Sequence, residues 1–128
     1  MTTSVVYDTG ALLAAERRDL RFGRVHTRRV GAGHPAAIVP VVVLAQAWRG
    51  GPQHGIVQVL KDCDVVADTA DVGRAAGLAC ARAGTSDVVD AIVVVTALAS
   101  EAAVVTSDPD DLRKLAAALG RRLDLLVV

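Results

Sequence analysis

The chain has 128 residues, and its 14 basic and 14 acidic side chains cancel to a formal net charge of +0. This length is enough for one domain over residues 1–128, with a core between two layers of secondary structure, and it excludes a second domain of ordinary size. The hydrophobic share of 52% comes mainly from Val, Ala and Leu, with only 2% aromatic residues. Such a composition is typical of buried parallel strands under Ala-rich helices.

Neither a membrane span nor a secretory segment is expected. The apolar run 36–47 is interrupted by Pro40 and falls short of the roughly 20 residues that a membrane span needs. Asp8 is reached before the apolar stretch of a signal peptide develops. Cys63 and Cys80 form no C-x-x-C motif and have no His at zinc spacing, so we expect both to be reduced and structural. The sequence therefore predicts a cytoplasmic protein without membrane contact.

Short apolar runs alternate with helical patterns along the whole chain. Runs rich in Val, Ile or Leu predict five strands, over residues 4–7, 36–39, 64–67, 102–106 and 123–127. Periodicity and end signals predict helices over residues 10–17, 20–30, 41–48, 53–60, 70–83, 87–100 and 109–119. Because the strands are separated by helices, we expect an α/β fold with a mainly parallel five-stranded sheet and helices on both faces.

Acidic residues follow the strands or open the helices at three places. Asp8 follows the first strand, Asp108 follows the fourth, and Asp87 and Asp90 open the helix 87–100. The carboxyl ends of neighbouring parallel strands meet at one crevice, so these acids can converge although they are far apart in sequence. Carboxylates brought together without basic partners repel each other, and a divalent cation is the usual remedy. The pattern predicts a site for a hard metal ion.

Helix capping is the competing explanation for these acids. Asp8 and Asp108 stand at N-cap positions, Asp87 suits the positive end of a helix dipole, and Asp111 could be only a capping partner. Asp90 is harder to explain by capping, because it lies a turn deeper and is followed by five apolar residues. We therefore favour Asp90 as a metal ligand, with Asp87 and Asp111 as weaker candidates. For Asp8 both explanations stay open, and for Asp108 the Asp-Pro helix start makes capping the strongest competing explanation.

Other polar residues give weaker signals. Gln46 is a polar residue in an apolar helix and should face the core or the site. Thr106 and Ser107 precede Asp108, and their hydroxyls could bind water or phosphate near it. The three histidines have neither metal spacing nor a Ser or Cys nucleophile beside them, which favours structural roles for His26, His34 and His54.

Basic residues crowd an early stretch of the chain, and three of them share a helical face. Arg21, Arg24 and Arg28 are spaced at i, i+3 and i+7 in the helix 20–30. This arginine stripe could meet the phosphates of an anionic polymer. A solvated helix face is the alternative for any one of these side chains.

Four segments carry a resemblance that covers nearly the whole chain. They are Val-Val-Tyr-Asp8-Thr-Gly-Ala-Leu-Leu-Ala, Val-Pro-Val-Val-Val-Leu-Ala-Gln46-Ala-Trp-Arg-Gly, Thr-Ser-Asp87-Val-Val-Asp90-Ala and Val-Val-Thr-Ser-Asp108-Pro-Asp-Asp111-Leu. In this order they resemble a PIN-domain ribonuclease, and more specifically a VapC-type toxin of a bacterial toxin-antitoxin pair. The resemblance implies a single PIN domain that cuts RNA with Mg²⁺ or Mn²⁺, forms a homodimer and is silenced by a cognate antitoxin protein.

The resemblance also assigns the site residues. The first, third and fourth acids of the family fall on Asp8, Asp90 and Asp108, whereas its second acid, usually Glu, falls on Gln46. A neutral amide attracts a cation less than a carboxylate does, although its carbonyl oxygen can still ligate a metal. The charge could be restored in part by Asp87, Asp111 or Glu16.

Three other functions compete with an active nuclease. A PIN-fold protein that has lost catalysis and only binds RNA or a partner is the main alternative, and Gln46 supports it. A haloacid-dehalogenase-like phosphatase needs a second acid where Gly10 stands. A receiver domain needs paired acids after its first strand and a phosphoacceptor after its third, and here only Asp8 and the poorly placed Asp68 are present.

Overall fold

The computed structural model describes residues 4–128, so residues 1–3 of the predicted domain lie outside the described part. Within it the chain forms five strands and seven helices. The strands are β1 (Val5–Tyr7), β2 (Ala37–Pro40), β3 (Cys63–Val66), β4 (Ala103–Thr106) and β5 (Leu125–Val127). The helices are α1 (Thr9–Glu16), α2 (Leu20–Gly31), α3 (Val41–Ala47), α4 (His54–Leu60), α5 (Ala70–Ala83), α6 (Val88–Ala99) and α7 (Pro109–Ala118).

All five strands pair in parallel in one sheet, in the order β3-β2-β1-β4-β5. The central strand is β1, where Val6 pairs with Ile38 of β2 and with Val104 of β4. From β1 the chain adds β2 and β3 on one side, and then places β4 and β5 on the other. The order of strands therefore reverses between β1 and β4, which is where open α/β sheets form a crevice at their carboxyl ends.

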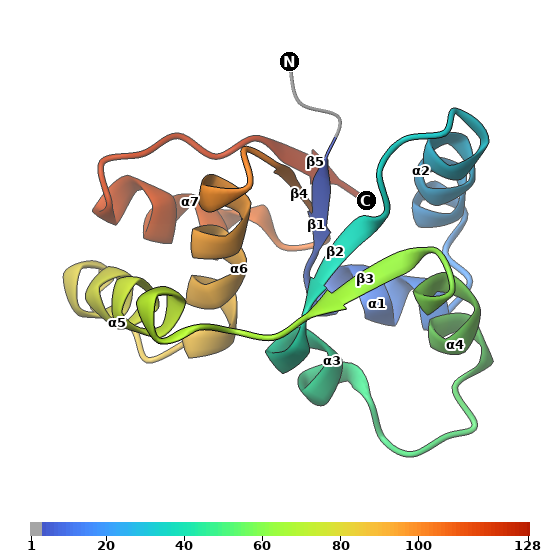
Figure 1. The fold of residues 1–128 in the computed structure, drawn as a ribbon, viewed down its shortest axis with the longest axis horizontal. Helices are drawn as coiled ribbons and strands as arrows, with labels where there is room; N and C mark the ends of the chain where they lie inside the picture. Colours follow the sequence, from blue (N-terminus) through green and yellow to red (C-terminus); the bar gives the residue numbers. More distant parts are fainter. Residues whose placement is uncertain (1–3) are drawn as a thin grey trace.

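Helices cover both faces of the sheet (Figure 1). The first layer contains α5, α6 and α7, which pack against one another. On the opposite face, α1 packs against α2 and α4. The short helix α3 contacts both α1 and α6. The predicted α/β architecture, a parallel five-stranded sheet between two helical layers, is confirmed.

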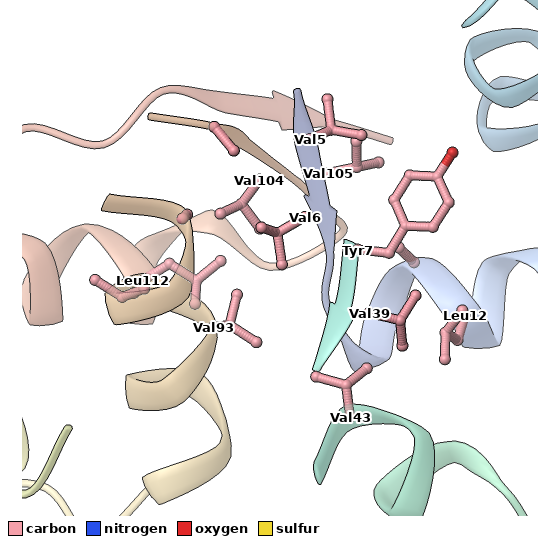
Figure 2. Close-up of a cluster of buried hydrophobic side chains, with 14 of the residues drawn as sticks. Val5, Val6, Tyr7, Leu12, Val39, Val43, Val93, Val104, Val105 and Leu112 are labelled. Atoms are coloured by element: carbon pink, nitrogen blue, oxygen red, sulfur yellow. The ribbon is translucent and has the colours of Figure 1, made fainter. Parts of the chain in front are cut away.

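The core is built from small aliphatic side chains on both faces of the central strands (Figure 2). Successive side chains of a strand point to opposite faces. Val6 and Val104 point toward Val93 of α6 and Leu112 of α7 (Figure 2). Tyr7 points to the other face, toward α1 and α2, and is fully buried. The core needs few aromatic residues because Val and Ala fill the narrow space between strands and helices.

Element boundaries differ from the predicted ones mostly by one or two residues, and α5 agrees at both ends. The last strand begins at Leu125 instead of residue 123, because ladder pairing with β4 begins only where Val104 meets Leu125. Cys63 and Cys80 are both free. Among residues 4–128, no helix combines the length and the apolar character needed to cross a membrane.

Candidate functional site

Asp8 lies where β1 ends and α1 begins, and it is 6% exposed. Its Oδ1 accepts a hydrogen bond from the backbone N–H of Ala11 at 2.8 Å. Asp8 therefore caps α1, as the capping explanation predicted. The neighbouring Gly10 is needed for close packing at this point. A Cβ there would lie 3.4 Å from Asp8 Oδ1 and would collide with the Ser107 hydroxyl. The turn after β4 thus lies directly against the start of α1.

Thr106 connects Asp8 to Asp108. It is the last residue of β4 and is fully buried. Its hydroxyl oxygen accepts the backbone N–H of Asp108 at 3.0 Å, and its side chain hydrogen-bonds to the carboxylate of Asp8. Sequence reasoning offered this hydroxyl as a contact for water or phosphate and missed its role in positioning the two acids. A Thr at a strand end, two residues before an acid, was the available signal.

Asp108 occupies the N-cap of α7, but within residues 4–128 its side chain makes no capping hydrogen bond. The helix-start signature Asp-Pro-x-x had made capping the strongest competing explanation for this acid. Its exposed carboxylate is instead close enough to Asp8 to raise the pKa of that carboxyl. Asp108 therefore belongs electrostatically to the group at the strand ends.

Asp87 and Asp90 lie at the first turn of α6. Asp87 is the N-cap, and its Oδ1 accepts the backbone N–H of Asp90 at 3.2 Å. This contact satisfies the helix terminus, so part of the role of Asp87 is structural. Asp90 is only partly exposed, one turn further into the helix.

The electrostatics show that five acids from three parts of the chain converge. The pKa of Asp90 is raised to about 7, first by burial and then by Asp87, Asp8 and Asp111. Burial also raises the pKa of Asp8, and Asp108 raises it further. None of the causes of these two shifts is a neighbouring cation. We call Asp8, Asp87, Asp90, Asp108 and Asp111 the acidic cluster.

Gln46 reaches the same edge of the sheet from α3. Its side chain is exposed, and its Oε1 accepts the hydroxyl of Thr9 at 2.5 Å. Thr9 directly follows Asp8, so Gln46 lies beside the acidic cluster and outside the core. Glu16 does not join them. It stands at the far end of α1, where its Oε1 accepts the backbone N–H of Ile56 in α4 at 3.2 Å.

A cavity of about 210 Å³ opens beside the acidic cluster. Asp87, Asp111 and Lys114 contribute to its lining, together with Thr85. Lys114 lies one turn after Asp111 on α7, and sequence reasoning had not selected it. Its cation borders the acids on the side of α7.

The donors of the cluster suit a hard divalent cation in their chemistry. Carboxylate oxygens are the ligands that Mg²⁺, Mn²⁺ and Ca²⁺ prefer, and carboxyl groups that raise each other's pKa are stabilised by a nearby positive charge. Within residues 4–128, no three His, Cys, Asp or Glu side chains are grouped tightly enough to hold a metal ion as they stand. The residues therefore fit such an ion by charge and donor type, but they do not form a ready coordination shell.

The arginine stripe lies elsewhere. Arg21, Arg24 and Arg28 are exposed on α2, which leads into the amino end of β2 (Figure 1). Arg24 and Arg28 line a groove of about 800 Å³ between α2 and α4. This groove is larger than the cavity beside the acids, but within residues 4–128 its lining contains no member of the acidic cluster. The structure therefore does not bring the stripe to the acids.

His26 has a structural role on the same face of the sheet. Its Nδ1 lies 2.6 Å from the hydroxyl of the buried Tyr7, and its Nε2 lies 2.9 Å from Asp62 Oδ2. Burial raises the pKa of Tyr7, so this phenol keeps its proton at neutral pH. The ring of His26 also stacks on Phe22 at a centroid distance of 5.8 Å.

Comparisons with known proteins identify the family and the fold. The model of the PIN domain family matches residues 5–118. Three solved structures share the fold. VapBC2 from Rickettsia felis, bound to a DNA fragment from its promoter, has a TM-score of 0.72 and 14% identity, covering 98% of this chain and 99% of that one. A toxin-antitoxin complex from Klebsiella pneumoniae has a TM-score of 0.66 and 14% identity over 84% and 88% of the two chains.

The third structure, PAE2754 from Pyrobaculum aerophilum, has a TM-score of 0.59 and 19% identity over 92% of this chain and 87% of that one. No curated protein matches the sequence. Because the family model spans almost all of the sheet and the acids at its carboxyl edge, the chain belongs to the PIN domain family.

Proposed function

We propose that the protein is a metal-dependent endoribonuclease that acts as the toxin of a VapC-type toxin-antitoxin pair. The observation that carries this proposal is the convergence of Asp8, Asp90 and Asp108 at the point where the strand order reverses. PIN domains are generally nucleases, and two of the similar structures are toxin-antitoxin complexes. The site and the family therefore lead to the same class of activity.

In this proposal Asp8, Asp90 and Asp108 hold Mg²⁺ or Mn²⁺, and Asp87, Asp111 and Gln46 complete the surroundings. A bound ion would stabilise negative charge on the scissile phosphate and make water a better nucleophile near neutral pH. The protein's own residues fix the positions of these acids. Thr106 holds Asp8 and Asp108 next to each other by hydrogen bonds, and the backbone N–H of Ala11 orients the Asp8 carboxylate.

RNA reaches a site that is strongly acidic, so cations must compensate for the repulsion of its phosphates. Lys114 borders the acids and can meet a phosphate next to the scissile one. The arginine stripe on α2 could add affinity only for RNA that extends to the other edge of the molecule, as Arg21, Arg24 and Arg28 do not border the acids.

The partners in this proposal are a cognate antitoxin and a second copy of the chain, in the cytoplasm. Exposed apolar side chains support an interface: Val41, Trp48 and Val57 are between 39% and 42% exposed on the side of α3 and α4. Trp48 at the end of α3 is a suitable anchor for the apolar segment of a partner. A basic side chain from the antitoxin could enter the acidic cluster and compete with the metal.

The nuclease assay is the direct test of the proposed activity. Purified protein should cleave a mixed RNA with Mg²⁺ or Mn²⁺ and stop in excess chelator. Asp8→Asn and Asp90→Asn should each lower the rate by at least about a hundredfold, because each removes a charge that the ion requires. Asp71→Asn, which removes an exposed carboxylate at the start of α5, outside the acidic cluster, is the matched control and should cleave normally. Cleavage that persists in chelator would remove the metal mechanism.

Gln46 supports one second candidate, a PIN-fold protein that binds RNA or a partner without cutting. A neutral amide stands at the position where an acid would strengthen ion binding. Binding of RNA by the parent protein, with no cleavage over a full titration of Mn²⁺, would select this candidate.

A further inference from the structure

A second cavity, of about 460 Å³, lies at the opposite end of α7 from the acidic cluster. Its polar lining consists of Arg113 on α7, Arg121 and Arg122 in the connection after α7, and Asp124 just before β5. We call it the arginine pocket. Sequence reasoning had not selected any of these arginines.

The backbone explains why the arginines gather there. Gly120 has a φ of 67°, a left-handed conformation that favours glycine and ends α7. The backbone N–H of Arg121 then bonds to the carbonyl of Ala116 at 3.0 Å, which fixes the connection against the last turn of the helix. Arg121 and Arg122 are thereby held on the rim of the cavity.

Positive charge in the arginine pocket is only partly neutralised by the protein. Three guanidinium groups and one carboxylate line it. Arg113 pairs with Asp110 at 3.4 Å, but both side chains are more than half exposed, so this pair is weak. Within residues 4–128, neither Arg121 nor Arg122 has an ion-pair or side-chain hydrogen-bond partner. Guanidinium groups placed together in this way suit a phosphate, which each can bind with two parallel hydrogen bonds.

The position of the pocket relates it to the acidic cluster. The first turn of α7 carries Asp111, and the connection with Arg121 and Arg122 follows its last turn. Figure 1 shows α7 leading away from the end of β4, with the connection returning from its far end to β5. A helix of 10 residues is about 15 Å long at 1.5 Å per residue. An extended RNA strand of several nucleotides could therefore contact both places at once.

We propose that the arginine pocket binds backbone phosphates of single-stranded RNA, away from the scissile bond. This inference rests on the proposed ribonuclease function and adds a requirement on substrate length. A strand that spans α7 gains the contacts of Arg121 and Arg122, whereas a dinucleotide held at the acids cannot reach them. Its three guanidinium groups would contact the phosphate backbone, and such contacts carry no sequence information directly.

The test compares two double variants of equal charge. Arg121→Gln/Arg122→Gln removes two of the three pocket arginines. Arg17→Gln/Arg74→Gln removes two exposed arginines elsewhere, one at the end of α1 and one on α5. Binding of a labelled 12-nucleotide RNA is measured by fluorescence anisotropy across a salt series, with chelator present. The slope of log K against log salt should flatten by about 1.4 for the pocket variant, since each lost phosphate contact removes about 0.7. The control variant should keep the parent slope.

Cleavage with Mn²⁺ supplies the second readout. The pocket variant should cut the long RNA more slowly and cut a dinucleotide at the parent rate. An unchanged salt slope, or an equal change in the control variant, would overturn the inference even if cleavage stays metal-dependent. If instead no RNA is cut but the slope still differs, the proposed activity fails and the pocket stands. Polyglutamate serves as a second probe. If the pocket variant loses affinity for polyglutamate but binds RNA like the parent, the pocket is a site for an acidic protein segment, and the inference is overturned as well.

Discussion

Single atoms decide how the acidic cluster is arranged. The hydroxyl of Thr106 hydrogen-bonds to both Asp8 and Asp108, and the carboxylate of Asp87 accepts the backbone N–H of Asp90. The sequence could predict which acids take part, since each stands at a strand end or a helix start. It could not predict the contact between Thr9 and Gln46, because those residues are 37 positions apart and meet only after α3 has packed against α1.

The raised pKa of Asp90 predicts how stability changes with pH when no divalent ion is present. Its pKa rises from the ordinary 3.8 to about 7 in the folded chain, so the folded state holds the proton more tightly. This contribution is fully present below about pH 3.8 and is lost as pH rises through 7. Because Asn does not ionise, Asp90→Asn removes this loss of stability at high pH. In chelator, the variant should gain about 1–2 kcal/mol over the parent between pH 4 and pH 8, less than the full shift implies because the side chain is partly solvated.

Urea unfolding at both pH values measures this gain. Asp110→Asn, an exposed acid of α7 outside the cluster, is the control and should show a smaller change. A stability difference between parent and Asp90→Asn that stays constant from pH 4 to pH 8 would contradict the electrostatic account of the cluster.

Gln46→Glu tests whether α3 belongs to the site. A carboxylate at this position keeps an acceptor for the Thr9 hydroxyl and adds a negative charge beside the acids. The Mn²⁺ concentration that gives half-maximal cleavage should fall on the order of tenfold, because a charge attracts a divalent ion more strongly than a neutral amide does. Gln58→Glu on α4 adds the same charge away from the cluster and serves as control. Equal midpoints for parent and Gln46→Glu would place Gln46 outside the reach of the ion.

At the scale of elements, helix ends were the most predictable feature. The helix α5 agrees at both ends with the predicted one because Thr69 caps its start and Gly84, with a φ of 71°, ends it. The close contact between α1 and α4 could not be predicted, since it depends on one glycine in a short helix. A Cβ at Gly55 would lie 2.7 Å from the Cα of Glu16 and would collide with the carbonyl oxygen of Ala15.

Gly55→Ala should therefore push α4 away from α1. We expect a loss of about 1–3 kcal/mol in the free energy of unfolding, as for other additions to a filled interior. The control is Gly77→Ala in the middle of α5, where no atom lies within 4 Å of an added Cβ. This control should gain about 0.5–1 kcal/mol, because alanine favours the helix. Equal shifts of the two urea midpoints in the same direction would show that α1 and α4 are not tightly packed at Gly55.

For the whole molecule, the parallel sheet determines where charges gather. Its carboxyl edge collects the acids that follow β1 and β4, and the start of α6 joins them. The sequence predicted this edge because it depends only on strand direction. It predicted the location of the arginines less well. The stripe on α2 lies near the amino end of β2, and the arginine pocket forms only where the connection after α7 folds back.

The central claim is that the acidic cluster forms one site for a divalent ion. Calorimetric titration of Mn²⁺ into the purified protein at pH 7.5 tests it without relying on any RNA substrate. The parent should bind Mn²⁺ with a defined stoichiometry, Asp90→Asn and Asp108→Asn should each bind at least about tenfold more weakly, and Asp124→Asn should bind like the parent. Equal Mn²⁺ affinity in the parent and in Asp90→Asn, or no binding by the parent at millimolar Mn²⁺, would contradict the claim.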